Sequence, residues 1–321
     1  MWGTLLPKRE PTTLKFANSG ISKYSKTMFN RGYQYRHVLG PEAAGQNVLA
    51  YLANAFPHST TDEWRCRLKA GEILVNNRPV DDSQPLRAGQ VLLWNRPPWL
   101  EEETPQHFNL LYRDAFLLAV DKPSGLPTIP GGGFYQNTLL TLVRRDFPLA
   151  RPLHRLGRGT SGLVLFALDT ETASDMHESW PNVQKQYQAL ASSVASEDTY
   201  DIRFPIGELA HPRLGKVHAA CSTGKPARSI ARVLRRLADS TLFEVDLLTG
   251  RPHQIRIHLA GIGCPLLGDP LYGAGGVPIS DRPGLPVDLG YHLHAKRLCF
   301  VHPKLGKTIE LRSPLPEMLR L

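Results

Sequence analysis

The sequence predicts an α+β protein with two folded units, and three observations lead to this class. A chain of 321 residues with 41% apolar residues is long enough for two domains with a sizeable core. Residues 41–99 contain two helix-like stretches and then a hairpin-like segment. Residues 106–321 alternate short apolar strands with turn residues and a few helices, which is typical of a mixed, mainly antiparallel sheet.

The chain begins with a basic segment that shows little apolar periodicity. Residues 1–40 hold seven Lys or Arg residues against Glu10 alone. We expect a flexible arm there, able to contact the phosphates of a nucleic acid. Two other interpretations remain open: the arm is an acid-poor organelle transit peptide, or the natural start is Met28.

The first folded unit is predicted to be small and to end at a linker. Its helices are expected around residues 48–52 and 64–68, and Asn76-Asn77 is expected to turn the chain between two strands. A turn at residues 87–90 leads into a strand at 91–94. The following run Asn-Arg-Pro-Pro-Trp and three consecutive glutamates read as a boundary, so we place the unit at 41–99 and the linker at 100–105.

The second unit, residues 106–321, is expected to hold the larger sheet. A helix is predicted over residues 252–260, with Pro252 in its first turn and Gly261 at its end, so that Arg256 points inward. The expected strands cover residues 108–112, 116–120, 162–168, 187–194 and 243–247.

Charge and cysteine content narrow the class of protein. The net charge of +9, with 38 basic and 29 acidic residues, favours a polyanionic partner. The four cysteines are scattered, which argues against a disulfide framework or a thiolate zinc site and fits a reducing compartment. No run of about 18 apolar residues and no apolar secretion signal is present, so we expect a soluble cytoplasmic protein without a membrane partner.

Residues 154–162 read His-Arg-Leu-Gly-Arg-Gly-Thr-Ser-Gly, which resembles the signature His-Arg-Leu-Asp-x-x-Thr-Ser-Gly of the RluA-type RNA pseudouridine synthases. Every fixed position matches except the aspartate, where Gly157 stands. Further blocks occur in the family's order, and several ordered blocks of this length are far more specific than one short motif. They are residues 121–127, 185–190, 250–259, 268–273, 293–295 and 302–303.

The first unit resembles a second family, the alpha-L-type RNA-binding module of ribosomal small-subunit proteins. The resemblance rests on the succession of two helices, Gly-x-Ile-x-Val-Asn and Gly-Gln-x-Leu. It implies that Arg65, Arg67 and Lys69 on the second helix face RNA. Arg65 and Lys69 lie four residues apart, on one helical face, as they also would on an ordinary solvated surface.

The synthase resemblance implies a cofactor-independent, metal-free isomerisation of uridines in structured RNA, ribosomal or transfer. Arg155 matches the arginine that fills the space of the flipped base, and Tyr187 matches the aromatic residue that stacks on that base. Arg256 matches the arginine that pairs with the catalytic aspartate. These residues, with the aspartate position Gly157, are our predicted site.

Gly157 cannot attack a sugar, remove a proton or form an ion pair. Asp169 is expected roughly 20 Å or more away, at the far end of a strand, whereas Asp121 and Asp269 lie in other family blocks and are the candidates for an acid that approaches the site. The sequence therefore leaves two hypotheses: a synthase that uses another acid, or a catalytically silent RNA-binding or RNA-chaperone protein that keeps the synthase fold. A carboxylate within hydrogen-bond reach of Arg256 would support an altered catalytic site.

Overall fold

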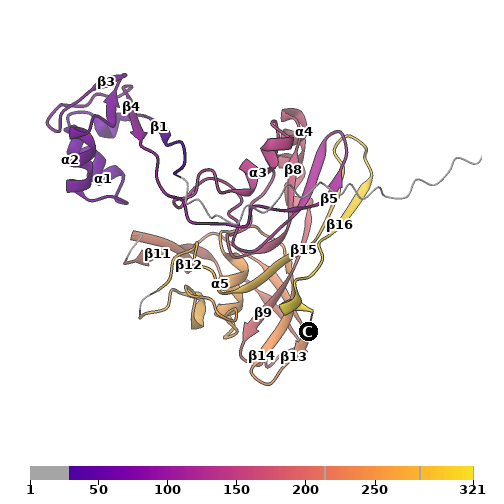
Figure 1. Cartoon of the computed structure of the whole chain (residues 1–321). Coiled ribbons are helices and arrows are strands. Elements are labelled where there is room, and N and C mark those ends of the chain that lie inside the picture. Colours follow the sequence, from indigo (N-terminus) through magenta and orange to yellow (C-terminus); the bar gives the residue numbers. More distant parts are fainter. Residues whose placement is uncertain (1–28, 213–214, 282, 321) are drawn as a thin grey trace, which may run out of the picture.

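The computed structural model describes residues 29–212, 215–281 and 283–320. The chain folds into a small amino-terminal module and a larger sheet-based domain, joined by an extended segment (Figure 1). Among the described residues, no helix is long and apolar enough to cross a membrane.

Two helices and a four-stranded antiparallel sheet of order β1-β4-β2-β3 build the module. Helix α1 (Val48–Ala55) is capped by Asn47, and helix α2 (Thr61–Lys69) begins with a capping box between Thr60 and Glu63. Their apolar faces pack with the strands around Trp64, which is only 1% exposed. The strands are β1 (Tyr33–Val38), β2 (Ile73–Val75), β3 (Arg78–Pro79) and β4 (Val91–Arg96).

The predicted hairpin at Asn76-Asn77 is confirmed. Both residues have positive φ, 48° and 62°, between β2 and β3. A two-residue turn with this backbone matches the twist of the strands, and asparagine tolerates it better than most residues.

Strand β1 corrects the boundary of the predicted arm. Residues 33–38, which we expected to be flexible, pair with β4 along their whole length, from Tyr33 opposite Arg96 to Val38 opposite Val91. All six side chains are exposed, so no burial pattern marks the strand in the sequence. Backbone pairing and aromatic contacts stabilise it instead. Residues 1–28, the rest of the predicted arm, lie outside the described part of the chain.

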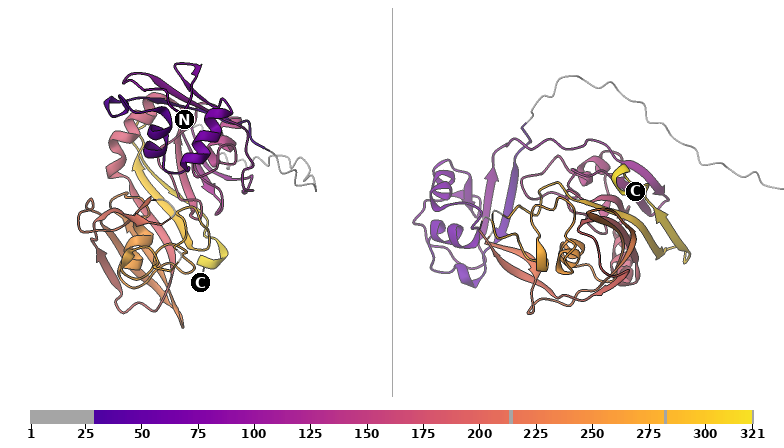
Figure 2. Two further views of the ribbon diagram at one scale, coloured as in Figure 1. Left: turned by 90° about the vertical axis from the view of Figure 1, so that its left-hand side faces the viewer. Right: turned by 90° about the horizontal axis from the view of Figure 1, so that it is seen from below.

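The second domain is built on a ten-stranded sheet whose main path runs β10-β13-β14-β9-β15-β8-β6-β5. Its strands curve around helix α5 (Gln254–Gly261), as the view from below shows (Figure 2). The sheet strands are β5 (Asn109–Arg113), β6 (Leu117–Lys122), β7 (Arg151–Pro152), β8 (Ser161–Ala167), β9 (Gln184–Ser192), β10 (Thr199–Ile202), β13 (Ser229–Arg236), β14 (Ser240–Leu247), β15 (His292–Val301) and β16 (Thr308–Arg312).

The remaining elements flank this sheet. Helices α3 and α4 are preceded by the N-cap residues Thr138 and Asp169, whose side chains accept hydrogen bonds from the first helical turn. The hairpin of β11 and β12 forms a separate two-stranded sheet. The bounds are α3 (Leu139–Asp146), α4 (Thr170–Ser179), β11 (Ile206–His211), β12 (Gly215–Ala220) and the 3-10 turns η1 (Pro41–Ala43), η2 (Trp180–Asn182), η3 (Ala274–Gly276) and η4 (Glu317–Leu319).

The five predicted strands of this domain are confirmed as β5, β6, β8, β9 and β14, with ends that differ by a few residues. The predicted helix is also present, but its start was wrong. Helix α5 begins at Gln254, because His253 before it has a left-handed backbone (φ 55°) and Pro252 lies in the preceding turn. Gly261 is its last residue, as predicted.

Gly162 makes the close pairing of β8 with β15 possible. These two strands run parallel, with Ala295 opposite Gly162, while the other pairs of the sheet are antiparallel. Gly162 has φ +107°, and a Cβ there would lie 2.3 Å from the carbonyl oxygen of Ala295. Only glycine fits this position, which sets the end of the signature loop 154–160.

The segment predicted as a linker is anchored by Glu101, which is only 5% exposed. Its carboxylate accepts hydrogen bonds from the backbone N–H groups of Tyr135, Gln136 and Asn137 in the second domain, and from the Asn30 side chain. Burial alone would raise the pKa of Glu101, but these hydrogen bonds hold it below its usual value. The linker is therefore a fixed connection between the domains.

Candidate active site

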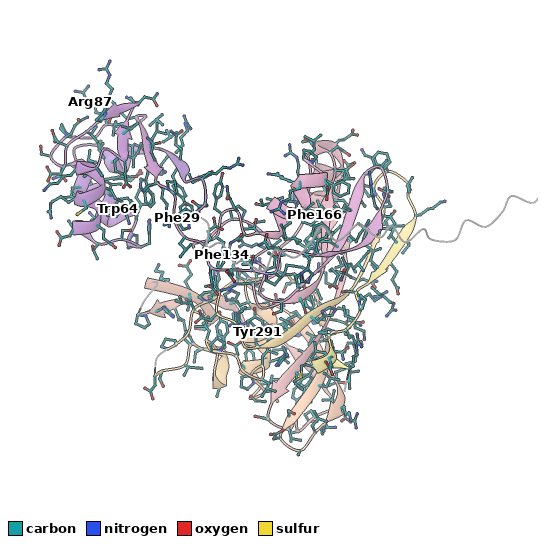
Figure 3. The ribbon with its side chains drawn as sticks, in the orientation of Figure 1. Phe29, Trp64, Arg87, Phe134, Phe166 and Tyr291 are labelled. Carbon is teal, nitrogen blue, oxygen red and sulfur yellow. The ribbon has the colours of Figure 1, made fainter. Side chains whose placement is uncertain are left out.

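The signature loop forms one wall of a cavity of about 310 Å³ in the second domain. Strand β9 adds Tyr187, the start of α5 adds Arg256, and the segment before β15 adds Tyr291. Figure 3 shows Tyr291 in the interior of this domain, well away from the module. Four predicted site residues therefore meet in one place, although they come from three separate blocks of the sequence: Arg155, Gly157, Tyr187 and Arg256.

His154, the first residue of the signature, has a structural role. Its Nε2 accepts a hydrogen bond of 3.0 Å from the backbone N–H of Leu165, and its ring stacks on Trp180 at 5.0 Å. Burial, with a contribution from Lys185, lowers the pKa of His154 to about 3. The ring is therefore neutral at physiological pH, as an acceptor must be, and fixes the loop against β8.

The next turn of the loop is held by buried polar groups. Lys122, fully buried, donates to the carbonyl oxygens of Pro123, Leu126 and Arg158 at 2.9, 2.7 and 3.2 Å. Arg158 in turn pairs through both terminal nitrogens with the carboxylate of Glu102 in the linker. The loop that carries Gly157 is thus fixed from both sides.

Arg155 differs from these neighbours because its side chain is exposed at the cavity. Among the described residues, no ion pair involves it. A free guanidinium at the mouth of a cavity is suited to bind a phosphate or to enter the space that a flipped base leaves.

Tyr187 is the aromatic residue of the cavity that the sequence singled out. It is 7% exposed, and burial raises the pKa of its hydroxyl to about 12. The phenol therefore keeps its proton at neutral pH. Its ring offers an apolar face for a base, and its hydroxyl offers a proton donor.

Arg256 binds a carboxylate, but one that the cavity does not expose. Its Nε and one terminal nitrogen each donate to Asp269 at 2.7 Å, and both side chains are nearly fully buried, at 3% and 1% exposure. Asp269 also accepts from the backbone N–H groups of Leu271 and Tyr272 at 2.9 and 3.1 Å. Four hydrogen bonds satisfy this carboxylate and hold it behind Arg256.

The other two acids considered from the sequence lie elsewhere. Asp169 caps helix α4 beyond the far end of β8, as the predicted strand required. Asp121 accepts a hydrogen bond of 2.8 Å from the Ser313 hydroxyl. Among the described residues that line the cavity, none is Asp or Glu.

Tyr291 occupies the space next to Gly157, and the sequence alone did not point to it. A Cβ at residue 157 would lie 3.0 Å from the Tyr291 hydroxyl oxygen. That hydroxyl is 3.3 Å from Thr160 Oγ1, and the ring lies 4.3 Å from the Arg256 guanidinium carbon. The one available clue was its position, two residues before the block Leu-His-Ala at 293–295.

Cations dominate the cavity. Besides Arg155 and Arg256, it is lined by Lys185 and Arg251, and His253 is kept neutral because burial lowers its pKa to about 3. Asp269 balances the charge of Arg256, but Arg155, Lys185 and Arg251 form no ion pair among the described residues, and their charge attracts a polyanion such as RNA. Among the described residues, no group of three or more His, Cys, Asp or Glu side chains is placed to hold a metal ion.

The three basic residues predicted for the module are not equivalent. Arg65 is paired with Asp62 at 2.5 Å and lies 3.8 Å from Asp82, and Lys69 is exposed. Arg67 instead packs against two tryptophan rings and lines a second cavity. None of the three lines the cavity at Gly157.

Comparison with known proteins assigns this architecture to a class. Residues 116–261 match the family described as RNA pseudouridylate synthase. An uncharacterized RNA pseudouridine synthase of Synechocystis is 42% identical over 276 residues, which cover 85% of this chain and 95% of the relative. The chain therefore belongs to the RNA pseudouridine synthases of the RluA type.

Other relatives span most of the chain as well. RNA pseudouridine synthase 5 of rice is 35% identical, with 91% of this chain and 89% of the relative covered. Ribosomal large subunit pseudouridine synthase D of Xanthomonas campestris is also 35% identical, with 88% and 89% covered. Among solved structures, human RNA pseudouridylate synthase domain containing 1 has a TM-score of 0.51 at 25% identity and covers 68% of this chain and 87% of its own.

Proposed function

We propose that this protein isomerises specific uridines to pseudouridine in structured RNA, without a cofactor. The observation that carries the proposal is the cavity in which Arg155, Tyr187 and Arg256 meet beside Gly157. Relatives named ribosomal large subunit pseudouridine synthase D favour ribosomal RNA as the substrate, with transfer RNA as the alternative. A cytoplasmic location is part of the proposal, and an organelle is the alternative if residues 1–40 act as a transit peptide.

The reaction breaks the bond between ribose carbon 1 and uracil N1 and forms a bond to uracil carbon 5. In the proposed roles, Arg155 occupies the space of the extruded nucleotide and Tyr187 stacks on the detached uracil. The Tyr187 hydroxyl, which holds its proton at neutral pH, donates it to uracil N1 as the glycosidic bond breaks, and the tyrosinate so formed takes the proton that carbon 5 loses once the new bond has formed. Arg256 lines the cavity as a fixed cation, held by Asp269, and stabilises negative charge on the base.

A second candidate function is favoured by one observation, the absence of Asp and Glu from the described lining of the cavity. A protein with this pocket that does not break the glycosidic bond would bind uridine-containing RNA as a chaperone. The pocket aromatic and the relatives named synthases favour the enzyme.

Release of tritium from RNA labelled at uracil carbon 5 tests the proposal. Native protein, Tyr187→Phe and Gly157→Asp would be compared on the same total RNA, with binding measured in parallel. We expect release by the native protein and a loss of at least about 100-fold in Tyr187→Phe at unchanged binding, since a positioned acid or base contributes about that much. Tight binding without release, with release gained in Gly157→Asp, would establish the RNA-binding alternative.

A further inference from the structure

A second and larger cavity, of about 730 Å³, lies between the module and the loop Gly131–Gly133 of the second domain. Direct contacts join the two sides, since Trp99 Nε1 donates to the Gly133 carbonyl at 2.7 Å and the ring of Tyr33 contacts that of Tyr135 at 5.0 Å. Its volume is within the range of about 300–1,000 Å³ that is usual for small-molecule sites.

One wall of this cavity is aromatic. Trp94 is its centre: Tyr35 stacks on it at 5.2 Å and 22°, and Trp64 meets it edge to face at 5.2 Å. His58 lies nearly parallel to Trp94 at 6.1 Å. Tyr35 and His58 are exposed and Trp94 is half-buried, so this wall faces solvent where a core would be closed.

Cations are interleaved with these rings. The Arg67 guanidinium lies 4.5 and 4.7 Å from the ring centres of Trp64 and Trp94. That of Arg96 lies 5.7 Å from the ring centre of Trp94 and 3.5 Å from that of Trp99, which is outside the lining. Among the described ion pairs, none engages Arg67 or Arg96. Neither charge is balanced by a carboxylate of the described residues, so both are available to a ligand, and both guanidinium groups lie against aromatic rings.

Acidic groups do not cancel this charge. Glu63 is the one carboxylate on the described lining, and it is engaged by the backbone N–H of Thr60 at 2.7 Å. Burial and then the charges of Arg67 and Arg96 lower the pKa of His58. A neutral His58 ring is free to stack on an apolar face.

The opposite wall is backbone. Gly131, Gly132 and Gly133 all have positive φ, at 148°, 58° and 92°, and a Cβ at Gly131 or Gly133 would meet no atom within 4 Å. Consecutive glycines of this kind let a ligand approach the main chain closely. The cavity thus combines flat rings, arginines without an ion-pair partner and a wall of glycine backbone.

We propose that this cavity binds one unpaired nucleotide of the RNA, with its base against the wall of Trp94 and His58 and its phosphate on Arg67 and Arg96. Aromatic and guanidinium planes with cations for the backbone are the chemistry by which single-stranded RNA is recognised. The identity of this RNA as the substrate rests on the proposed function. This nucleotide would be bound in addition to the target uridine in the catalytic cavity, and the two contacts together would fix the position of the RNA on the protein.

The test is a titration of the full chain with a 12-nucleotide unstructured RNA, followed by tryptophan emission, for native protein, His58→Ala and Arg67→Met. We expect native emission to change on binding, and each variant to bind about 10-fold more weakly, because stacking on an aromatic side chain is worth about 1–3 kcal/mol per base. In Arg67→Met, the salt dependence of binding should also become shallower by about 0.7, the value for one phosphate contact on a single strand.

Arg87→Ala is the matched control, because Arg87 is exposed at the tip of the module, away from Trp64 and Phe134 (Figure 3). It should bind within about twofold of native, and thermal unfolding should be the same for all variants. Two variants that bind like the native protein, or RNA that leaves the emission unchanged, would overturn the inference and leave the cavity to a protein partner. Binding with the expected losses but no tritium release would instead refute only the proposed function.

Discussion

At the scale of single residues, Tyr291 limits which side chains fit at position 157, where the family signature has aspartate and this chain has glycine. The phenol hydroxyl lies 3.0 Å from where the first side-chain atom of residue 157 would be. A side chain at this position would therefore require the Tyr291 hydroxyl to yield by a few tenths of an ångström, and the ring of Tyr291 also lies against the guanidinium of Arg256. Arg256, for its part, already has a bidentate partner in Asp269. Gly157 and Arg256 are thus both in contact with Tyr291, and Asp269 lies on the other side of this arrangement as the partner of Arg256.

This coupling predicts the outcome of a double-mutant cycle. Gly157→Asp alone should lower the free energy of unfolding by about 1–3 kcal/mol through overpacking, and Gly157→Asp combined with Tyr291→Phe should recover part of that loss. Urea unfolding of the four proteins measures the coupling, expected at about 0.5–3 kcal/mol. Strictly additive effects would mean that Tyr291 does not limit residue 157.

His154 predicts a pH dependence of stability. In the unfolded chain it takes up a proton below about pH 6.5, but in the fold its pKa is about 3. Acid therefore favours the unfolded state between these values, by up to about 1.4 kcal/mol per pH unit from this group. His154→Gln keeps an acceptor for Leu165 but does not titrate, so its unfolding free energy should fall less steeply from pH 6.5 to 4.5. Equal slopes in denaturant titrations would contradict this.

At the scale of elements, the parallel contact of β8 with β15 determines where the signature loop ends. The contact requires a residue without a side chain and with positive φ, which is Gly162. Helix α5 is positioned by an equally local feature, the left-handed backbone of His253, whose Nδ1 is 2.6 Å from the Tyr272 hydroxyl. These two junctions bring Gly157 and Arg256 to one cavity.

Gly162→Ala should therefore be one of the more damaging small substitutions in the domain. Gly263→Ala is the control, because Gly263 also has positive φ (+79°) but no atom within 4 Å of an added Cβ. The control should cost about 1–2 kcal/mol of unfolding free energy from backbone conformation alone. Gly162→Ala should cost at least about 2 kcal/mol more, since the backbone of Ala295 cannot yield without separating the strands. Similar losses in thermal or urea unfolding would refute the steric argument.

At the scale of the whole molecule, the hydrogen bonds of Glu101 join the linker to the second domain. The second cavity lies between the two domains that this linker connects. Glu101→Ala leaves three partly buried N–H groups and the Asn30 amide without their acceptor, so we expect a loss of about 2–4 kcal/mol and faster hydrogen exchange at Tyr135, Gln136 and Asn137. Asp239→Ala, at an exposed carboxylate, is the control. Unchanged exchange in Glu101→Ala would mean that the linker is not held by this residue.

Because the pKa of Glu101 is lowered in the folded protein, acid should remove the contribution of this carboxylate to the free energy of unfolding. The unfolded chain protonates this carboxyl near its usual pKa, while the folded chain protonates it only at lower pH. Its contribution to stability is therefore complete above the usual value and is lost as the pH falls through the folded value. The difference in unfolding free energy between native protein and Glu101→Ala should shrink below about pH 4.5 and stay constant from pH 6 to 8.

Local pattern alone was enough for much of the fold. Short apolar stretches between turn residues predicted β8 and β14, the asparagine pair predicted the β2–β3 turn, and the ordered blocks indicated the family. Strand β1 was missed because all of its side chains are exposed, and a strand held by backbone pairing leaves no burial pattern in the sequence. The start of α5 was missed because the left-handed backbone of His253 depends on its packing.

By itself the sequence determined the α+β class, the family and the absence of an aspartate before Thr160-Ser161-Gly162, since these follow from local composition and order. Only the tertiary structure decided that Asp269 pairs with Arg256 from behind the cavity, that Tyr291 fills the space beside Gly157, and that Arg67 faces the second cavity while Arg65 pairs with Asp62. The physical reason is that these relations join residues far apart in the chain or on opposite faces of one helix, and depend on how strands and loops pack in three dimensions.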